Sequence, residues 1–128
     1  MQLKTLTPNV MVEDVNQTIE FYRDVLGFQV NVTVPDTGQF DWASMKRDSV
    51  ELMFQARSSL SSEIPAYADL PIGGALTFFI QMEGLQELYD RLKGKITIVQ
   101  DLHTTFYGMR EFAIRDCNGY VLTFAEAV

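Results

Sequence analysis

Apolar positions in the first half of the chain change from strand-like to helical spacing and back. Residues 3–12 form a strand-like run, and Asp14 then precedes residues 15–26, in which apolar side chains recur at helical spacing. Gly27 stands where a glycine usually ends a helix, and residues 28–34 alternate as a strand does. The pattern predicts a strand, an amphipathic helix and a second strand.

A hairpin is predicted next, with arms at 39–46 and 49–55 and a bend near Arg47 and Asp48. We expect the apolar stripe of the second arm to lie under the helix: Val50, Leu52 and Phe54. A tight bend predicts three cross-strand pairs: Ser44 with Glu51, Trp42 with Met53, and Phe40 with Gln55. Two large aromatic side chains then occupy the face without a helix.

The same order of elements restarts after residues 57–73, a Ser-rich segment with two prolines that indicates a connection. One helix and four strands are expected, in the order strand 75–82, helix 83–94, and strands 95–101, 108–116 and 120–127. The restart indicates an internal duplication with a period of about 67–72 residues. We therefore predict a single α+β domain of two paired βαβββ modules, 3–56 and 74–127, joined by the linker at 57–73.

Alternation also assigns faces in the second module. The side chains expected under its helix are Phe112, Ile114, Tyr120, Leu122 and Phe124. Those expected on the opposite face are Glu111, Ala113, Arg115, Val121, Thr123 and Ala125. A face without a helix meets another sheet, solvent or a ligand, so we expect either a pocket or a packed contact there.

Composition narrows the classes of partner. The chain has 128 residues, 47% of them hydrophobic, and a net charge of −7, which repels nucleic acid and anionic membranes. The sequence contains a single cysteine, Cys117, which forms no internal disulfide, and no apolar run long enough for a membrane span. The first residues lack the apolar block of a signal peptide, so we expect a cytoplasmic protein.

Two segments, together with the repeated order of elements, resemble the vicinal oxygen chelate superfamily of glyoxalases, extradiol dioxygenases and bleomycin-resistance proteins. They are VMVEDVNQTIEFYRDVLGF at 10–28 and YGMREFAIRDCNGYVLTFAE at 107–126. The nearest likeness is to the bleomycin-resistance proteins, through RDSVELMFQA, EGLQELYDRL and YGMREFAIRDCNGY. The resemblance implies the concave mixed sheets of that fold, with helices outside, and a homodimer with clefts at its interface.

Metal-dependent members of the superfamily place four His or Glu ligands on cleft-facing strands. The positions carried over to this chain are Thr7, Glu51, Ala75 and Thr123. Only Glu51 is a good cation ligand, whereas a divalent metal needs three or four converging donors. We therefore expect no metal, no cofactor and no catalytic residue.

Two further residues carry reactive side chains. His103 lies in DLHTTFYG, which is expected to be a loop, and an exposed loop histidine is the simplest interpretation. Cys117 stands in the RDCNGY turn, where the family usually has proline, and a nucleophilic thiol needs a neighbouring base. A thiol without a catalytic role is the expectation.

The resulting hypothesis is a metal-free protein that sequesters a small aromatic or cationic ligand. The resemblance implies that Trp42, Phe79 and Tyr107 stack on it, and Glu51 and Glu111 supply charge. The predicted ligand-binding set is Phe40, Trp42, Glu51, Met53, Phe79, Tyr107 and Glu111. The alternatives are a metal-dependent lyase, isomerase or dioxygenase with a displaced site around Glu51, Glu111 and His103, and a module that serves only for interaction.

Overall fold

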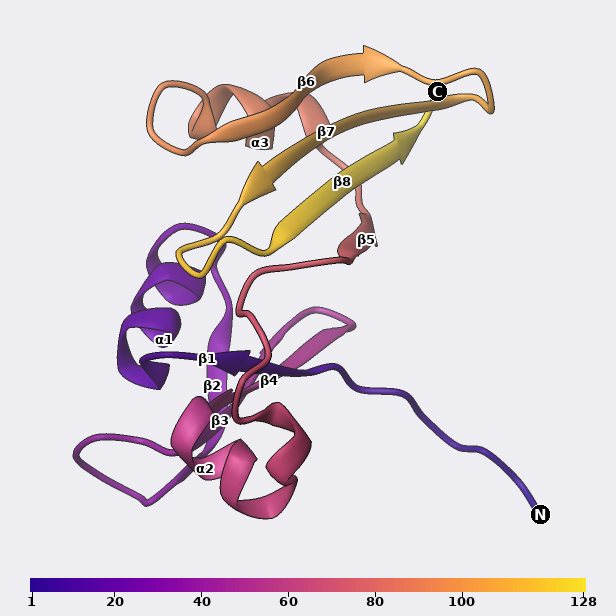
Figure 1. Cartoon of the computed structure of the whole chain (residues 1–128). Coiled ribbons are helices and arrows are strands. Elements are labelled where there is room, and N and C mark those ends of the chain that lie inside the picture. Colours follow the sequence, from indigo (N-terminus) through magenta and orange to yellow (C-terminus); the bar gives the residue numbers. More distant parts are fainter. The chain divides into compact units, whose positions relative to one another are not determined.

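The computed structural model describes residues 1–128 and divides into two compact units, 1–72 and 73–128, each described here by itself (Figure 1). The first unit contains β1 (Asn9–Val12), α1 (Val15–Asp24), β2 (Gln29–Val34), β3 (Trp42–Arg47), β4 (Val50–Ala56), α2 (Arg57–Glu63) and the 3₁₀ helix η1 (Pro65–Tyr67). The second contains β5 (Thr77–Gln81), α3 (Leu85–Leu92), β6 (Ile98–Thr104), β7 (Met109–Arg115) and β8 (Val121–Ala127).

Both units have the same sheet topology. The strand order is β1-β4-β3-β2 in the first unit and β5-β8-β7-β6 in the second. In each sheet the first strand of the unit pairs in parallel with the last, and the other pairs are antiparallel. The predicted duplication of a βαβββ module and the α+β class are confirmed.

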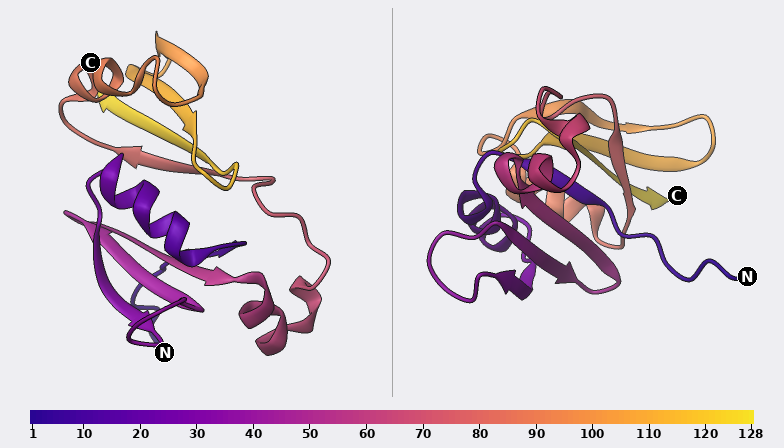
Figure 2. Two further views of the ribbon diagram at one scale, coloured as in Figure 1. Left: turned by 90° about the vertical axis from the view of Figure 1, so that its left-hand side faces the viewer. Right: turned by 60° about the horizontal axis from the view of Figure 1, so that its bottom comes forward.

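α1 begins at Val15, as the sequence pattern indicated, and ends at Asp24, two residues before the predicted end. The Asp14 side chain accepts a hydrogen bond from the Gln17 amide at 3.0 Å, which satisfies an otherwise unpaired group at the helix N-terminus. Gly27 has a φ of +72° and allows the Phe28 amide to reach the Tyr22 carbonyl at 2.9 Å. The helix lies across one face of its sheet (Figure 2), and its Tyr22 ring lies 4.8 Å from that of Phe54.

The cross-strand pairs predicted for the β3–β4 hairpin are wrong by two residues. Trp42 pairs with Gln55, Ser44 with Met53, and Lys46 with Glu51. The strands continue to Arg47 and Val50, so the turn holds only two residues, and Asp48 has a φ of +51°. A shift of two residues leaves every side chain on its predicted face, and Leu52 and Phe54 are buried as expected.

The connection at 57–73 contains two helices that its loss of periodicity did not indicate. α2 contacts β1 and β4, buries Leu60, and receives a hydrogen bond from Gln55 Nε2 to Ser59 Oγ at 2.9 Å. Arg57 fixes the following segment by donating to the Leu70 carbonyl at 2.7 Å while pairing with Glu13 at 3.1 Å. One end of the sheet face opposite α1 is therefore covered by α2.

The second unit matches its predicted faces, but β6 is displaced along the sequence. All five side chains expected under the helix have little exposed area: Phe112, Ile114, Tyr120, Leu122 and Phe124. The Tyr89 ring of α3 lies 5.3 Å from that of Phe112. β6 runs from Ile98 to Thr104 rather than over 95–101, so the loop assignment of His103 is wrong. Two register shifts in the β6–β7 pair accommodate the displaced strand.

None of the helices has the length and hydrophobicity that crossing a bilayer requires.

Replacement of Asp14 by alanine removes the N-terminal cap of α1 and is expected to lower the free energy of unfolding by about 1 kcal/mol. Asparagine at the same position keeps a capping oxygen, so Asp14→Asn should stay within a few tenths of a kcal/mol, roughly, of the parent. Urea unfolding followed by far-ultraviolet circular dichroism measures both. An Asp14→Asn protein as unstable as Asp14→Ala would rule out the capping explanation.

Candidate functional site

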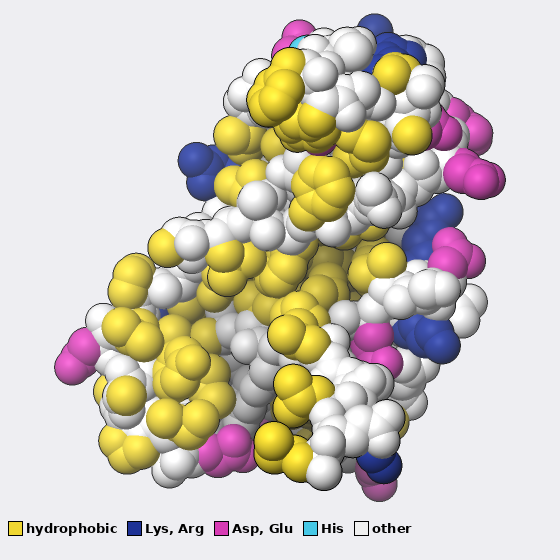
Figure 3. Space-filling model, turned by 90° about the vertical axis from the view of Figure 1, so that its right-hand side faces the viewer, with side chains coloured by type: hydrophobic (Ala, Val, Ile, Leu, Met, Phe, Trp, Pro, Cys, Tyr) yellow, Lys and Arg dark blue, Asp and Glu magenta, His cyan; other side chains and the backbone are white.

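Each unit has one candidate site, the sheet face opposite α1 in the first and opposite α3 in the second, and we call these the open faces. Hydrophobic side chains cover much of the surface shown in Figure 3, and Lys and Arg lie mainly at its margins. The exposed apolar side chains of these faces include Val32, Val34 and Phe79, which makes the faces candidates for contact with another molecule.

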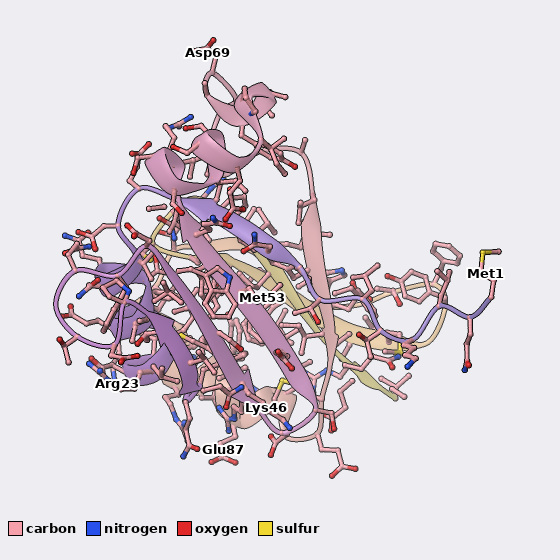
Figure 4. All side chains as sticks on the ribbon, turned by 90° about the horizontal axis from the view of Figure 1, so that it is seen from below. Met1, Arg23, Lys46, Met53, Asp69 and Glu87 are labelled. Atoms are coloured by element: carbon pink, nitrogen blue, oxygen red, sulfur yellow. The ribbon has the colours of Figure 1, made fainter.

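The open face of the first unit changes from apolar to polar along its strands. Cross-strand neighbours form three rows: Val34, Trp42 and Gln55; Val32, Ser44 and Met53; and Gln29, Lys46 and Glu51. Met53 lies near the middle of β4 and Lys46 near the hairpin turn (Figure 4). Four residues along a strand span about 13 Å, so this is roughly the distance between the aromatic and the charged row.

Three of the four residues predicted in this unit share that face. Trp42 and Met53 are half-buried, and Glu51 is exposed and accepts a hydrogen bond from Ser44 Oγ at 3.3 Å. Phe40 lies outside β3, where its amide donates to Asn16 Oδ1 at 2.9 Å. The structure therefore groups Trp42, Glu51 and Met53, and leaves Phe40 in the preceding loop.

On the open face of the second unit, aromatic and acidic side chains flank small ones. One row consists of Phe79, Thr123 and Ala113, and the next of Gln81, Ala125, Glu111 and His103. Phe79 is 51% exposed, so Phe78, which lies 6.4 Å from the ring of Tyr120, is the more buried of the adjacent pair. Phe79 is thus an open-face residue.

Glu111 and Tyr107 form the most specific polar contact of this face. The Tyr107 hydroxyl donates a hydrogen bond to Glu111 Oε2 at 2.6 Å, which is the one hydrogen bond of the Glu111 side chain. The Glu111 residue is only 6% exposed and takes part in none of the four ion pairs of the chain. Because the carboxylate accepts a hydrogen bond from the protonated hydroxyl and repels its ionised form, the pKa of the Tyr107 hydroxyl is raised above its ordinary value.

His103 lies opposite Glu111 in the β6–β7 ladder rather than away from the site. Its Nδ1 is 2.7 Å from the Asp101 carbonyl oxygen, which only accepts hydrogen bonds. The proton of the neutral ring therefore resides on Nδ1, and Nε2 keeps its lone pair. Sequence patterns missed this position because the two register shifts in β6 have no simple periodic signal.

Phe106 is a second residue that the sequence interpretation left out. It is 99% exposed beside the start of β7, and its ring meets that of Tyr107 edge to face at 5.0 Å. The Thr105 amide donates to the Met109 carbonyl at 2.7 Å, which closes the loop under both rings. The adjacent aromatic pair at 106–107 was the available signal.

The side chains at the positions expected for metal ligands do not form a typical metal-binding donor set. Thr7 precedes β1 and Ala75 precedes β5, so both assignments to strand positions are wrong. Thr77 lies beside Thr123, with their hydroxyl oxygens 2.7 Å apart. Thr7, Thr77 and Thr123 contribute only hydroxyl groups, and Glu51 contributes the one carboxylate. Nickel, zinc and iron prefer imidazole and carboxylate or thiolate donors, so this set does not fit them. Cys117 lies exposed in the β7–β8 turn.

Substitution of Glu111 by glutamine should lower the pKa of Tyr107 toward that of an ordinary tyrosine, because the charged acceptor is lost. Because the pKa of Tyr107 is higher in the folded than in the unfolded protein, its contact with Glu111 stabilises the fold fully at pH values below the unfolded pKa. This stabilisation is lost as the pH rises through the folded pKa. A tyrosine-labelled NMR titration measures the change. Tyr89, whose pKa is raised by Asp101, serves as the internal control and should not move. Equal shifts at both tyrosines would contradict the assigned contact.

Comparison with known proteins agrees with this architecture. The family profile described as Glyoxalase/Bleomycin resistance protein/Dioxygenase superfamily matches residues 4–124. No curated protein sequence matches the chain.

Solved structures of the same fold span nearly the whole chain. A glyoxalase/bleomycin resistance protein/dioxygenase from Nocardioides has a TM-score of 0.79 at 18% identity, covering 100% of this chain and 86% of its own. TioX from Micromonospora sp. ML1 has a TM-score of 0.74 at 17% identity, with 98% and 97% covered. A glyoxalase-related enzyme from Clostridium phytofermentans has a TM-score of 0.74 at 21% identity, with 100% and 98% covered. With the profile match over nearly all residues and the duplicated βαβββ sheets, the chain belongs to the glyoxalase/bleomycin resistance protein/dioxygenase superfamily.

Proposed function

We propose that this protein binds a small molecule without transforming it, and that the molecule combines a planar apolar group with a positive charge. The observation that carries the proposal is Glu111, a nearly buried carboxylate with one hydrogen bond and no cationic partner in the chain. Removing a carboxylate from water is unfavourable unless a cation or several donors compensate. A cationic ligand group would supply that compensation.

Exposed aromatic rings beside the carboxylate support the planar part of the ligand. Phe79 and Tyr107 are 51% and 54% exposed, and Tyr107 is held at Glu111 by its hydroxyl. Stacking on an aromatic ring contributes about 0.5–1.5 kcal/mol beyond the burial of area, and a cation over the ring adds a similar amount. These interactions suit recognition of a flat cation.

Trp42 and Met53 extend the proposal to the open face of the first unit, with Glu51 as a second acidic group. Each unit is proposed to contribute its open face to ligand binding in a homodimer, as the resemblance to bleomycin-resistance proteins implies. The ligand itself is defined here only by its chemistry: flat, partly apolar and positively charged.

Titration with metal-free bleomycin, a cationic glycopeptide with planar rings, tests the proposal through the fluorescence of Trp42, the single tryptophan. We expect a saturable change, and about tenfold weaker binding for Phe79→Ala and for Glu111→Gln, since each loses a contact worth about 1.4 kcal/mol. Glu20→Gln, which alters an exposed side chain of α1 on the other side of its sheet, should bind as the parent does.

Absence of saturable binding, for bleomycin and for simpler flat cations alike, would refute the proposal. If Phe79→Ala and Glu111→Gln bind as tightly as the parent, the assigned site is refuted, although the protein still binds the ligand.

One observation favours the alternative of a metal-dependent enzyme: His103 lies opposite Glu111, with Nε2 unprotonated in the neutral ring. These residues offer two donors, whereas a divalent metal needs three or four. Under the binding proposal, protein purified without chelator should contain far less than one equivalent of nickel, zinc or iron by mass spectrometry. A stoichiometric metal that His103→Ala abolishes would establish the enzyme class instead.

A further inference from the structure

A polar cavity of about 360 Å³ lies in the first unit, where the end of α1 meets β2 and β3. Its lining residues are Gly27, Gln29, Asn31, Lys46, Arg47 and Asp48. The volume is at the lower end of the range for small-molecule sites, so it suits a small ion or one end of a larger molecule. It does not include the aromatic residues proposed to stack on a ligand.

Most hydrogen-bond donors around the cavity are unused. Lys46 forms neither an ion pair nor a hydrogen bond, although Glu51 is its neighbour on β4. The side-chain amides of Gln29 and Asn31 also lack protein partners, and both residues are exposed at the cavity. An ammonium group and two amides are therefore available to a ligand.

The fourth donor, Arg47, is held in place by the backbone. Its Nη1 donates to the Leu26 carbonyl at 2.6 Å, and its Nε lies 3.8 Å from the Asp48 carboxylate. A Cβ on Gly27 would come within 2.9 Å of Nη1, and the φ of +72° there is also unfavourable for other residues. Glycine at position 27 thus permits a fixed guanidinium whose Nη2 still has protons to donate.

A β-bulge in β2 places Asn31 at the same cavity. The β2–β3 register shifts between Val30 and Val32, so Asn31 has no partner on β3, and a bulge of this kind redirects the side chain of the extra residue. Two separate backbone features therefore converge on one polar cavity.

Charge gives the cavity its selectivity. Two cations and one carboxylate line it, and that carboxylate, Asp48, is already beside Arg47. The chain as a whole carries a net charge of −7, so most of its surface repels anions. We infer that this cavity binds a small oxyanion, a carboxylate or phosphate group, through Lys46, Arg47, Gln29 and Asn31. The inference goes beyond the proposed ligand of the aromatic residues and does not depend on it.

Titration of the full chain with inorganic phosphate, and separately with acetate, tests the inference by amide NMR at low ionic strength. We expect saturable shifts confined to the amides of 27–31 and 46–48. Lys46→Gln should weaken phosphate binding by about tenfold, since one charge-assisted hydrogen bond is lost, and Lys46→Arg should largely restore it. Lys95→Gln makes the same change of charge at an exposed position in the second unit and should bind as the parent does.

Saturable shifts with phosphate alone would identify a phosphate site, and shifts with both probes a general oxyanion site. The inference is overturned if neither probe gives saturable shifts in these segments, or if Lys46→Gln and Lys95→Gln weaken binding equally. Because neither probe is aromatic or cationic, this result is separate from the outcome of the bleomycin titration.

Discussion

The central constraint on this protein is that each four-stranded sheet packs one face against a single helix of its own unit. A sheet of this size has apolar side chains on both faces, but α1 and α3 cover only the faces of Phe54 and Phe112. The opposite faces are left to carry Trp42, Phe79 and the two acidic side chains. In the first unit, α2 covers one end of that face through Gln55 and Ser59. The proposed binding chemistry depends on this incomplete cover.

Under the binding proposal, the open faces hold a molecule rather than react with it. Their aromatic rings and carboxylates interact with a ligand by stacking and electrostatic attraction, which form no covalent bond. The hydroxyl groups of Thr77 and Thr123 bond to each other at 2.7 Å, and Thr123 is one of the four positions to which the family resemblance assigns metal ligands. His103 and Glu111 are the pair with acid–base potential, and Tyr107 already uses one oxygen of the carboxylate. Under the binding proposal, the Glu111 carboxylate pairs with a positively charged group of the ligand.

The two charge environments proposed here are complementary. Glu111 lies on the second unit with no cation of its own, whereas Lys46 and Arg47 lie at the hairpin end of the first, where Asp48 lines the cavity and Glu51 is the cross-strand neighbour of Lys46. A protein with a net charge of −7 attracts cations over most of its surface. The oxyanion cavity is a local exception that depends on backbone geometry at Gly27 and Asn31.

The sequence by itself determined the elements and faces whose causes are local. Helical spacing with Asp14 before it and Gly27 after it located α1, and alternation assigned Leu52, Phe54 and Phe124 to the helix side, because each signal lies within a few neighbouring residues. Tertiary structure decided the rest. The β3–β4 register, two residues from its predicted value, escaped the pattern because such a shift preserves every face. The placement of His103 opposite Glu111 and of Asn31 in the cavity depends on bulges, which arise from strand pairing between distant segments and have no periodicity of their own.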